Sequence, residues 1–410
     1  MEVCVNVGLV SVVVLVGSCL LLEVGLRLLF GFGNPLLYLA DAEIGYLLAP
    51  NQRTRRFGNR IAINEYSMRS STITNTRPTS TLRVLLLGDS VANGASWTDQ
   101  NRTISALMTT QLELAVRVAS DESSIGHKPF ERVEVLNASA NSWGPRNELG
   151  YLKRFGSFEA QAIVLLLNTD DLFAAAPTSD PVGRAPNYPN RKPPYALAEV
   201  YTRYLSPRLS RLRMKTLTKK LAGLRDEQRR KFASMPPLSP CSSENTQSGS
   251  SDRHSCQGAS YANGAPTLAP ELPEPRSGLA QQETEAFHSD SLAFNLDAIR
   301  QIQALAAHAG AEFVLAMTPL WREIAEPGAC NYELKARDRL TKLTQDEPIR
   351  YLDFLPMFNR VETPQKLYRD HIHLSPEGNQ RVSEAIARSL VPLLHLSATS
   401  TNGEKGMDHL

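Results

Sequence analysis

Two short motifs, far apart in the chain, carry side chains that could act together as a nucleophile and its base. The first, Gly-Asp-Ser90, follows an apolar run directly and precedes a helical stretch. A serine hydroxyl attacks a carbonyl carbon only when a base removes its proton. The second motif offers that base, because Asp370 and His373 stand three residues apart, a spacing at which the carboxylate can accept the second ring N–H. We therefore predict Ser90 as nucleophile, His373 as base and Asp370 as orienting acid, with His371 as a neighbour only.

Short apolar runs alternate with helical stretches around these motifs, which predicts a parallel sheet covered by helices on both faces. In such a sheet the functional side chains gather at the carboxyl ends of the strands. The predicted strands are 83–87, 133–137, 162–167, 312–317 and 349–352, and the predicted helices lie near 101–117, 145–155, 292–309, 330–344 and 377–395.

Both motifs, in this order and on these elements, resemble those of the SGNH (GDSL-like) hydrolases, and the resemblance covers nearly all of 41–395. It implies a flavodoxin-like three-layer α/β/α sandwich with a parallel five-stranded sheet, and a serine esterase. Further matches, to membrane-anchored members, are Glu23-x-x-x-Arg27, Asp41-x-x-x-Gly45-Tyr46 with Pro50, and Ile63-Asn64 through Met68-Arg69.

The family holds the developing oxyanion with the nucleophile's amide, a glycine amide and an asparagine side chain, and the last two are altered here. Ser142 stands in the glycine's place, where a positive φ would strain a serine, and Gly144 is the alternative donor. Asp170 stands in the asparagine's place, and an ionised carboxylate only accepts hydrogen bonds. The predicted oxyanion set is thus Ser90, Ser142, Gly144 and either an inward-turned Asn168 or a protonated Asp170.

The start of the chain predicts a membrane anchor. Residues 3–22 carry no charge, and twenty helical residues rise about 30 Å, the thickness of a bilayer core. The segment lacks the basic start of a signal peptide, so we predict an uncleaved, single-pass anchor over 1–31. Arg27 and later arginines follow the apolar run, and the positive-inside rule would place the main domain in the cytoplasm. The hydrolase prediction favours a periplasmic or extracellular domain, so the orientation stays open.

Residues 190–290 are predicted to interrupt the hydrolase domain. The stretch 203–231 carries eleven Lys or Arg against two acidic residues, with leucines at near-helical spacing. This predicts a basic amphipathic helix that is either solvated or meets anionic lipid or an acidic glycan. Residues 236–276 are rich in Pro and Ser and predict a disordered loop. Cys241 and Cys256 bracket a short part of this loop and could pair in an oxidising compartment.

The whole chain is therefore predicted to be one decorated α/β hydrolase. The predicted segments are an anchor over 1–31, a lead-in segment packed on the catalytic domain over 32–80, the first part of the hydrolase domain over 81–189, the insertion over 190–290, the second part over 291–395, and a disordered tail over 396–410. Trp97 and Trp143 could stack on a sugar in the cleft, but loop or core packing is the favoured interpretation for both.

Composition narrows the function. The net charge is +2, which argues against a nucleic-acid binder, and no metal-binding triad or phosphate-binding loop occurs, so we predict no metal or cofactor. The predicted function is a membrane-anchored serine esterase that removes short, O-acetyl-like acyl groups from a small molecule or a glycan. Two alternatives stay open: an O-acyltransferase that uses the same triad, and a catalytically weak scaffold or glycan-binding protein, which the altered asparagine motivates.

Overall fold

The computed structural model describes residues 2–122, 130–210, 278–324 and 328–394, together with positions 213, 214, 216, 218 and 220. The predicted loop 236–276 with Cys241 and Cys256, much of the predicted basic helix 203–231, and the predicted tail 396–410 lie outside the described residues.

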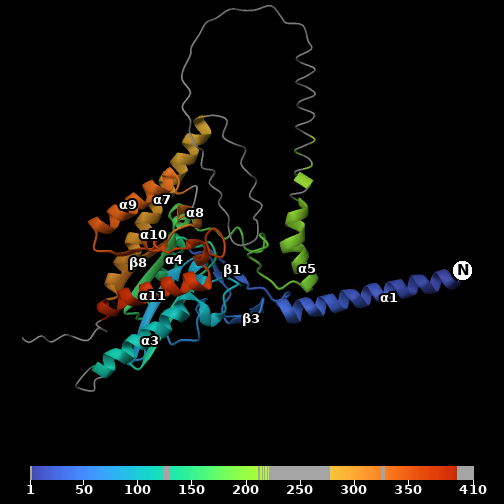
Figure 1. The fold of residues 1–410 in the computed structure, drawn as a ribbon, viewed down its shortest axis with the longest axis horizontal. Helices are drawn as coiled ribbons and strands as arrows, with labels where there is room; N and C mark the ends of the chain where they lie inside the picture. Colours follow the sequence, from blue (N-terminus) through green and yellow to red (C-terminus); the bar gives the residue numbers. More distant parts are fainter. Residues whose placement is uncertain are drawn as a thin grey trace, which may run out of the picture.

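A five-stranded parallel sheet forms the centre of the molecule (Figure 1). Its strands lie in the order β6-β5-β7-β8-β9, the flavodoxin-like order in which the first and third strands flank the switch point. Every residue of β5 is buried, as expected for a central strand covered on both faces. The strands are β5 (Thr81–Gly88), β6 (Arg132–Ser139), β7 (Ala162–Asn168), β8 (Glu312–Thr318) and β9 (Arg350–Asp353). The predicted fold class is confirmed.

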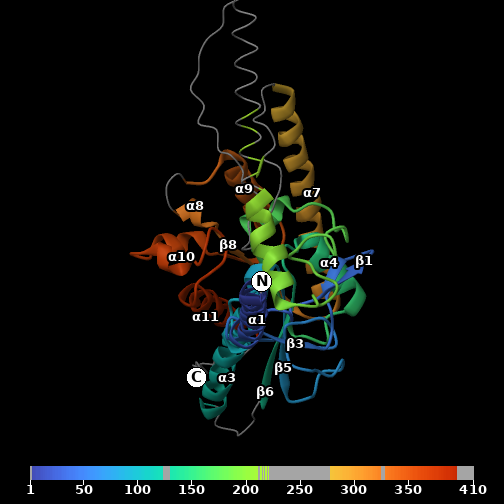
Figure 2. The ribbon, with the colours of Figure 1, turned by 90° about the vertical axis from the view of Figure 1, so that its right-hand side faces the viewer.

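Helices form one layer on each face of the sheet (Figures 1 and 2). On one face, α3 (Ile104–Glu122) and α11 (Pro376–Leu393) cover Leu82, Val84 and Leu86 of β5. On the other face, α4 (Pro145–Phe155), α7 (Gly278–His308) and α9 (Asn331–Asp346) cover Leu85 and Leu87. This alternation along β5 is the two-residue period of a strand buried between two helical layers.

Shorter elements connect these layers. The helices are α2 (Ser90–Asn93), α5 (Ala196–Val200), α8 (Trp321–Ile324) and α10 (Leu355–Asn359), with 3₁₀ turns at Gln100–Arg102, Thr169–Phe173 and Pro364–Leu367 and a π turn at Tyr201–Leu205. The helix α7 begins well before the predicted start near 292, because its first turns are polar and produce no apolar period.

Two hairpins precede the sheet and pack on the domain. The first pairs β1 (Tyr38–Asp41) with β2 (Gly45–Leu48), and the second pairs β3 (Gln52–Arg56) with β4 (Asn59–Ile63). Trp143 is 1% exposed, and its indole N–H donates to the Tyr46 carbonyl over 3.0 Å. Trp143 is therefore a core residue that fixes the loop before α4 to the first hairpin.

At the start of the chain, α1 (Glu2–Gly25) runs into a π turn at Leu26–Phe30 and projects away from the domain (Figure 1). Leu9–Phe30 is long and apolar enough to cross a membrane, with a mean hydropathy of 2.5. A signal sequence near an N-terminus passes the same test of length and hydropathy.

Candidate active site

The nucleophile candidate stands where β5 turns into α2. Asp89 caps this short helix, since its Oδ1 accepts the Val91 amide over 2.7 Å. A side chain at Gly88 would put its Cβ 2.7 Å from the Leu166 carbonyl oxygen, so only glycine lets the turn pack against β7. Ser90 is 3% exposed and lies at the carboxyl edge of the sheet, beside the switch point between β5 and β7.

The structure brings His373 and Asp370 to this serine. His373 Nε2 lies 2.9 Å from Ser90 Oγ, and Nδ1 lies 3.0 and 2.8 Å from the two carboxylate oxygens of Asp370. Asp370 Oδ1 also accepts the amides of Ile372 and His373. Because Nδ1–H donates to the carboxylate, Nε2 carries the lone pair that can accept the serine proton.

The carboxylate of Asp370 stays charged in this environment. Burial alone would raise its pKa, but the hydrogen bonds and the charge of His373 hold the pKa well below its usual range. His371 sits to one side, with Nδ1 3.8 Å from Asp370 Oδ1, while His373 is the histidine that reaches Ser90. The structure thus places Ser90, His373 and Asp370 side by side and leaves His371 outside this series.

Trp97 borders the candidate triad. Its ring lies edge-on to the His373 ring, with 4.6 Å between centroids, and the Arg369 guanidinium lies 5.2 Å above it. Trp97 is partly exposed, so one side of it is available at the rim of the site. Of the two tryptophans considered from the sequence, only Trp97 is placed where it could contact a substrate.

Ser142 adopts the glycine-like backbone that its position in the chain demands. Its φ is +56°, a left-handed conformation that costs a non-glycine residue roughly 1–2 kcal/mol. The Tyr188 hydroxyl donates to Ser142 Oγ over 3.0 Å and helps to hold the loop. The strain expected from the sequence is therefore present, and the conformation is kept despite it.

Two of the predicted oxyanion donors are committed elsewhere. The Gly144 amide donates to Asn147 Oδ1 over 3.1 Å, as part of the α4 cap. Asn168 is 0% exposed, and its Nδ2 donates to Asp89 Oδ2 and to Asp171 Oδ2 over 3.0 and 2.8 Å. The expectation that Asn168 turns towards the oxyanion is wrong, because both of its amide hydrogens bind buried carboxyls.

Asp170, in contrast, stays at the margin of the site with its side chain 35% exposed. Burial raises its pKa to about 6, although Arg322, whose Nη2 lies 3.9 Å from Asp170 Oδ1, opposes this rise. Arg322 is itself held by Glu333 and Tyr332. The Asp170 carboxyl can therefore be protonated in mildly acidic solution, which is the alternative left open by the sequence.

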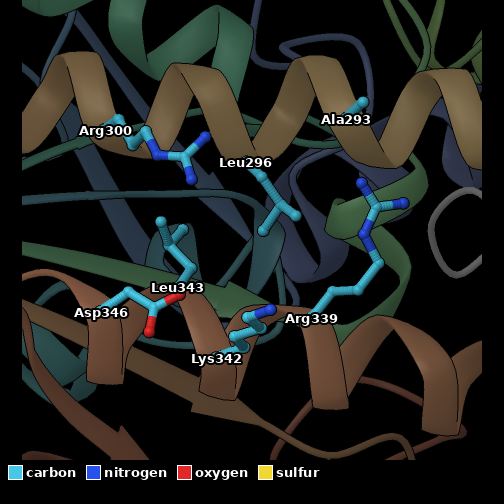
Figure 3. Close-up of a pocket in the computed structure, with 7 residues that line it drawn as sticks. All are labelled: Ala293, Leu296, Arg300, Arg339, Lys342, Leu343 and Asp346. Atoms are coloured by element: carbon cyan, nitrogen blue, oxygen red, sulfur yellow. The ribbon is translucent and has the colours of Figure 1, made fainter.

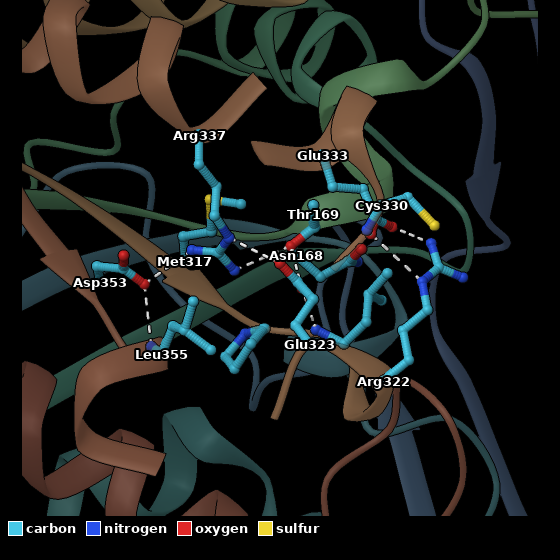
Figure 4. Close-up of polar contacts among 12 residues, drawn as sticks. Asn168, Thr169, Met317, Arg322, Glu323, Cys330, Glu333, Arg337, Asp353 and Leu355 are labelled. Carbon is cyan, nitrogen blue, oxygen red and sulfur yellow. Dashed lines mark hydrogen bonds and ion pairs between the residues drawn. The ribbon is translucent and has the colours of Figure 1, made fainter. Parts of the chain in front are cut away.

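A buried ion network that the sequence did not reveal supports this edge of the sheet (Figure 4). Arg337 of α9 binds Glu323 over 2.7 Å, Asp353 over 2.9 Å and the Thr169 hydroxyl over 3.0 Å. Glu323 accepts in turn from Thr169 and from the Leu320 amide. A single guanidinium thus joins the ends of β7 and β9 to α8 and fixes the turn that carries Asp170.

Behind the serine lies a cluster of three buried carboxyls: Asp89, Asp171 and Glu148. Burial raises the pKa of each, and their mutual repulsion adds to the rise in Asp171 and Glu148. Neither carboxyl oxygen of Glu148 has a hydrogen-bond partner among the described residues. A buried carboxyl without such partners is far less costly when protonated, so its surroundings favour the neutral form of Glu148.

Replacing Glu148 with glutamine is expected to flatten the pH dependence of stability. A raised folded-state pKa stabilises the protein fully below the unfolded value of 4.5, and this contribution is lost as pH rises through the folded pKa. Above pH ~4.5 the free energy of unfolding should therefore fall less steeply with pH in E148Q than in wild type. The two slopes should differ by about 1.4 kcal/mol per pH unit. Chemical denaturation across this range measures it. The exposed Glu43→Gln is the control, and equal slopes for E148Q and wild type would contradict the inference.

Two cavities lie apart from the residues of the candidate site. One, of about 250 Å³, lies between α7 and α9, where Arg300, Arg339, Lys342 and Asp346 line it (Figure 3). Another, of about 830 Å³, is bordered by the second hairpin, α3 and β6. Neither of these two cavities is lined by Ser90, His373 or Asp370.

No family model and no curated protein matches the chain. Solved structures do resemble it. The structure of TesA is 13% identical, with a TM-score of 0.36, over 76% of this chain and 99% of its own. A putative lipolytic protein of the G-D-S-L family from Desulfitobacterium hafniense is 10% identical, with a TM-score of 0.33, over 75% and 98%. A lipase/acylhydrolase from Enterococcus faecalis is 9% identical, with a TM-score of 0.34, over 76% and 96%.

Proposed function

We propose that this protein is a membrane-anchored serine esterase that hydrolyses short acyl esters. The observation that carries the proposal is the hydrogen-bonded series Ser90–His373–Asp370, with 2.9 Å between Ser90 Oγ and His373 Nε2. A serine with this partner and a correctly fixed imidazole tautomer is the constellation that acyl transfer requires. The sequence resemblance to SGNH hydrolases points to the same chemistry.

The reaction would proceed in two matched halves. His373 Nε2 takes the Ser90 proton as Oγ bonds to the ester carbonyl carbon, and the amides of Ser90 and Ser142 hold the resulting oxyanion. The tetrahedral species collapses, the C–O bond to the alcohol breaks, and the alcohol leaves with the proton from Nε2. Water then repeats the steps on the acyl-serine, giving a carboxylic acid and restoring Ser90.

The proposed substrates are short acyl esters of a small-molecule or glycan alcohol, because the partly exposed Trp97 lies beside the histidine, where its ring could contact a sugar. If a sugar hydroxyl replaced water in the second half, the same residues would perform acyl transfer. Because the usual oxyanion-binding residues are altered, a second function is also proposed: a catalytically weak scaffold or glycan-binding protein. The proposed location is a single-pass anchor with the catalytic domain in the periplasm or outside the cell.

The test is covalent labelling of the full-length protein with a fluorophosphonate, together with turnover of p-nitrophenyl acetate. Wild type is expected to label and to turn over the ester, whereas S90A is expected to do neither. The nearby Ser96→Ala controls for general damage to this loop and should behave as wild type. Equal behaviour of wild type and S90A in both assays would overturn the proposal and favour the scaffold.

A further inference from the structure

We propose that the helical segment 196–210 lies flat on the surface of the bilayer that holds the anchor. The side of the segment that would contact the bilayer consists of Tyr201, Leu205 and Leu209. The inference rests on the proposed membrane anchoring, and it adds a second, peripheral contact that sets how the catalytic domain stands on the membrane.

The segment begins at the base of the anchor. The carboxylate of Glu23, in α1, accepts the amides of Ala196 and Leu197 over 2.8 and 2.9 Å, and Arg27 donates to the Pro194 carbonyl over 3.0 Å. These amides open α5, so the carboxylate also meets the positive end of the helix dipole. The anchor and the segment are therefore joined at one point rather than linked by a free loop.

The direction of the segment places it along a membrane surface. In both views, α5 and the turns that follow it run crosswise to α1 (Figures 1 and 2). A helix that crosses the bilayer near its normal leaves a crosswise helix at its base in the plane of the headgroups. The domain lies on one side of this plane, and the free end of α1 lies on the other (Figure 1).

One side of the segment is locked to the domain. Glu199 forms a buried ion pair with Arg56 of β3, with distances of 2.5 and 3.2 Å, and accepts the Gly33 amide over 2.7 Å. Tyr204 packs edge-on against Phe32, with 5.8 Å between centroids. Because a buried ion pair is strongly directional, the rotation of the segment about its own axis is fixed.

The opposite side is apolar and open. Tyr201, Leu205 and Leu209 are 54%, 47% and 56% exposed, and their spacing of four residues places them on one helical stripe. Arg208, beside them, is also exposed and could meet lipid phosphates. Tyrosine, leucine and arginine together are typical of a helix that lies in a membrane interface.

A second element reaches the same level. Phe57, at the tip of the β3–β4 hairpin, donates its amide to the Phe30 carbonyl at the end of the anchor over 3.0 Å, and it is 45% exposed. In the same hairpin Asn59 donates to the Ser96 carbonyl over 3.1 Å, next to Trp97 at the rim of the site. The lipid-facing tip is thus tied to the candidate active site, which fixes the height of that site above the bilayer.

The experiment places a fluorescent probe at single cysteines of the full chain, reconstituted in vesicles of phosphatidylcholine and phosphatidylglycerol. The five native cysteines are replaced with alanine, and NBD is attached at Leu205→Cys or Leu209→Cys. The matched controls are Val14→Cys in the anchor and Leu114→Cys on α3, which are 60% and 63% exposed. Quenching is compared between lipids that carry a nitroxide at the headgroup, lipids that carry it deep in the acyl chain, and aqueous iodide.

The probes at 205 and 209 are expected to be quenched by the headgroup nitroxide, the probe at 14 by the deep nitroxide, and the probe at 114 by iodide alone. If 205 and 209 behave like 114 while 14 is quenched in the bilayer, the flat helix is overturned and the anchor stands. If the probe at 14 is not quenched by lipid either, the anchor fails and the inference fails with it.

Discussion

Asp370→Asn is expected to lower kcat for ester hydrolysis by on the order of 10⁴ without unfolding the site. Oδ1 of Asp370 accepts the amides of Ile372 and His373, and the oxygen of an asparagine would keep these bonds. Its NH₂ group would then take the place of Oδ2, which lies 2.8 Å from His373 Nδ1. Two donors cannot face each other, so the ring proton would move to Nε2, and His373 could no longer accept the Ser90 proton.

Steady-state kinetics of p-nitrophenyl acetate hydrolysis measure this loss of kcat. The rate of fluorophosphonate labelling should fall in parallel. Asp338→Asn is the matched control, because Asp338 is exposed on α9 and the same change there should leave kcat intact. His371→Ala should cost far less than D370N, since His371 does not reach Ser90. A D370N variant as active as wild type would remove Asp370 from the proposed triad and leave His373 oriented by something else.

The sheet and the position of Ser90 at its edge could be predicted because their signals are local. The run before Ser90 is apolar and short, as a buried strand is, and Asp370 and His373 lie within one turn of each other. The contact between Ser90 and His373 spans most of the chain. It could be expected only because parallel strands present their carboxyl ends at a single edge of the sheet.

The surroundings of the site could not be predicted in the same way. Arg337 and Asn168 bind partners that are distant in sequence, and Glu148 is buried beside the charge of Asp89. A lone charged or amide residue in a helix or strand gives no sign of such burial. Glu199 shows this most clearly. It falls in the predicted insertion, yet it forms the buried ion pair that joins α5 to β3.

The backbone conformation of Ser142 could not be predicted from its residue type. Serine disfavours a positive φ, which made Gly144 a reasonable alternative donor. In the structure the loop keeps Ser142 in the left-handed region and uses the Gly144 amide for the helix cap. Gly144 is needed instead for close packing, since an added Cβ would lie 2.4 Å from the Cβ of Ala174.

Asp170→Asn is expected to raise kcat/KM at pH ~8 by on the order of a hundredfold, the lower end of the range that one oxyanion donor contributes. The pKa of Asp170 is raised to about 6, so its carboxyl is ionised above that pH and repels the developing oxyanion. Below it, the protonated carboxyl can donate a hydrogen bond as an asparagine does. The gain from D170N should therefore shrink as pH falls below about 6, where wild type recovers its own donor.

Two companions separate the contributions of charge and donation. Asp170→Ala removes the charge without supplying a donor, so it should lie between wild type and D170N at alkaline pH and below wild type in mild acid. Asp180→Asn, at a side chain that is 78% exposed, controls for a change of net charge alone. A kcat/KM–pH profile for each variant gives the answer. If D170N matches wild type at every pH, Asp170 does not face the oxyanion, and the amides of Ser90 and Ser142 must hold it without a side-chain donor.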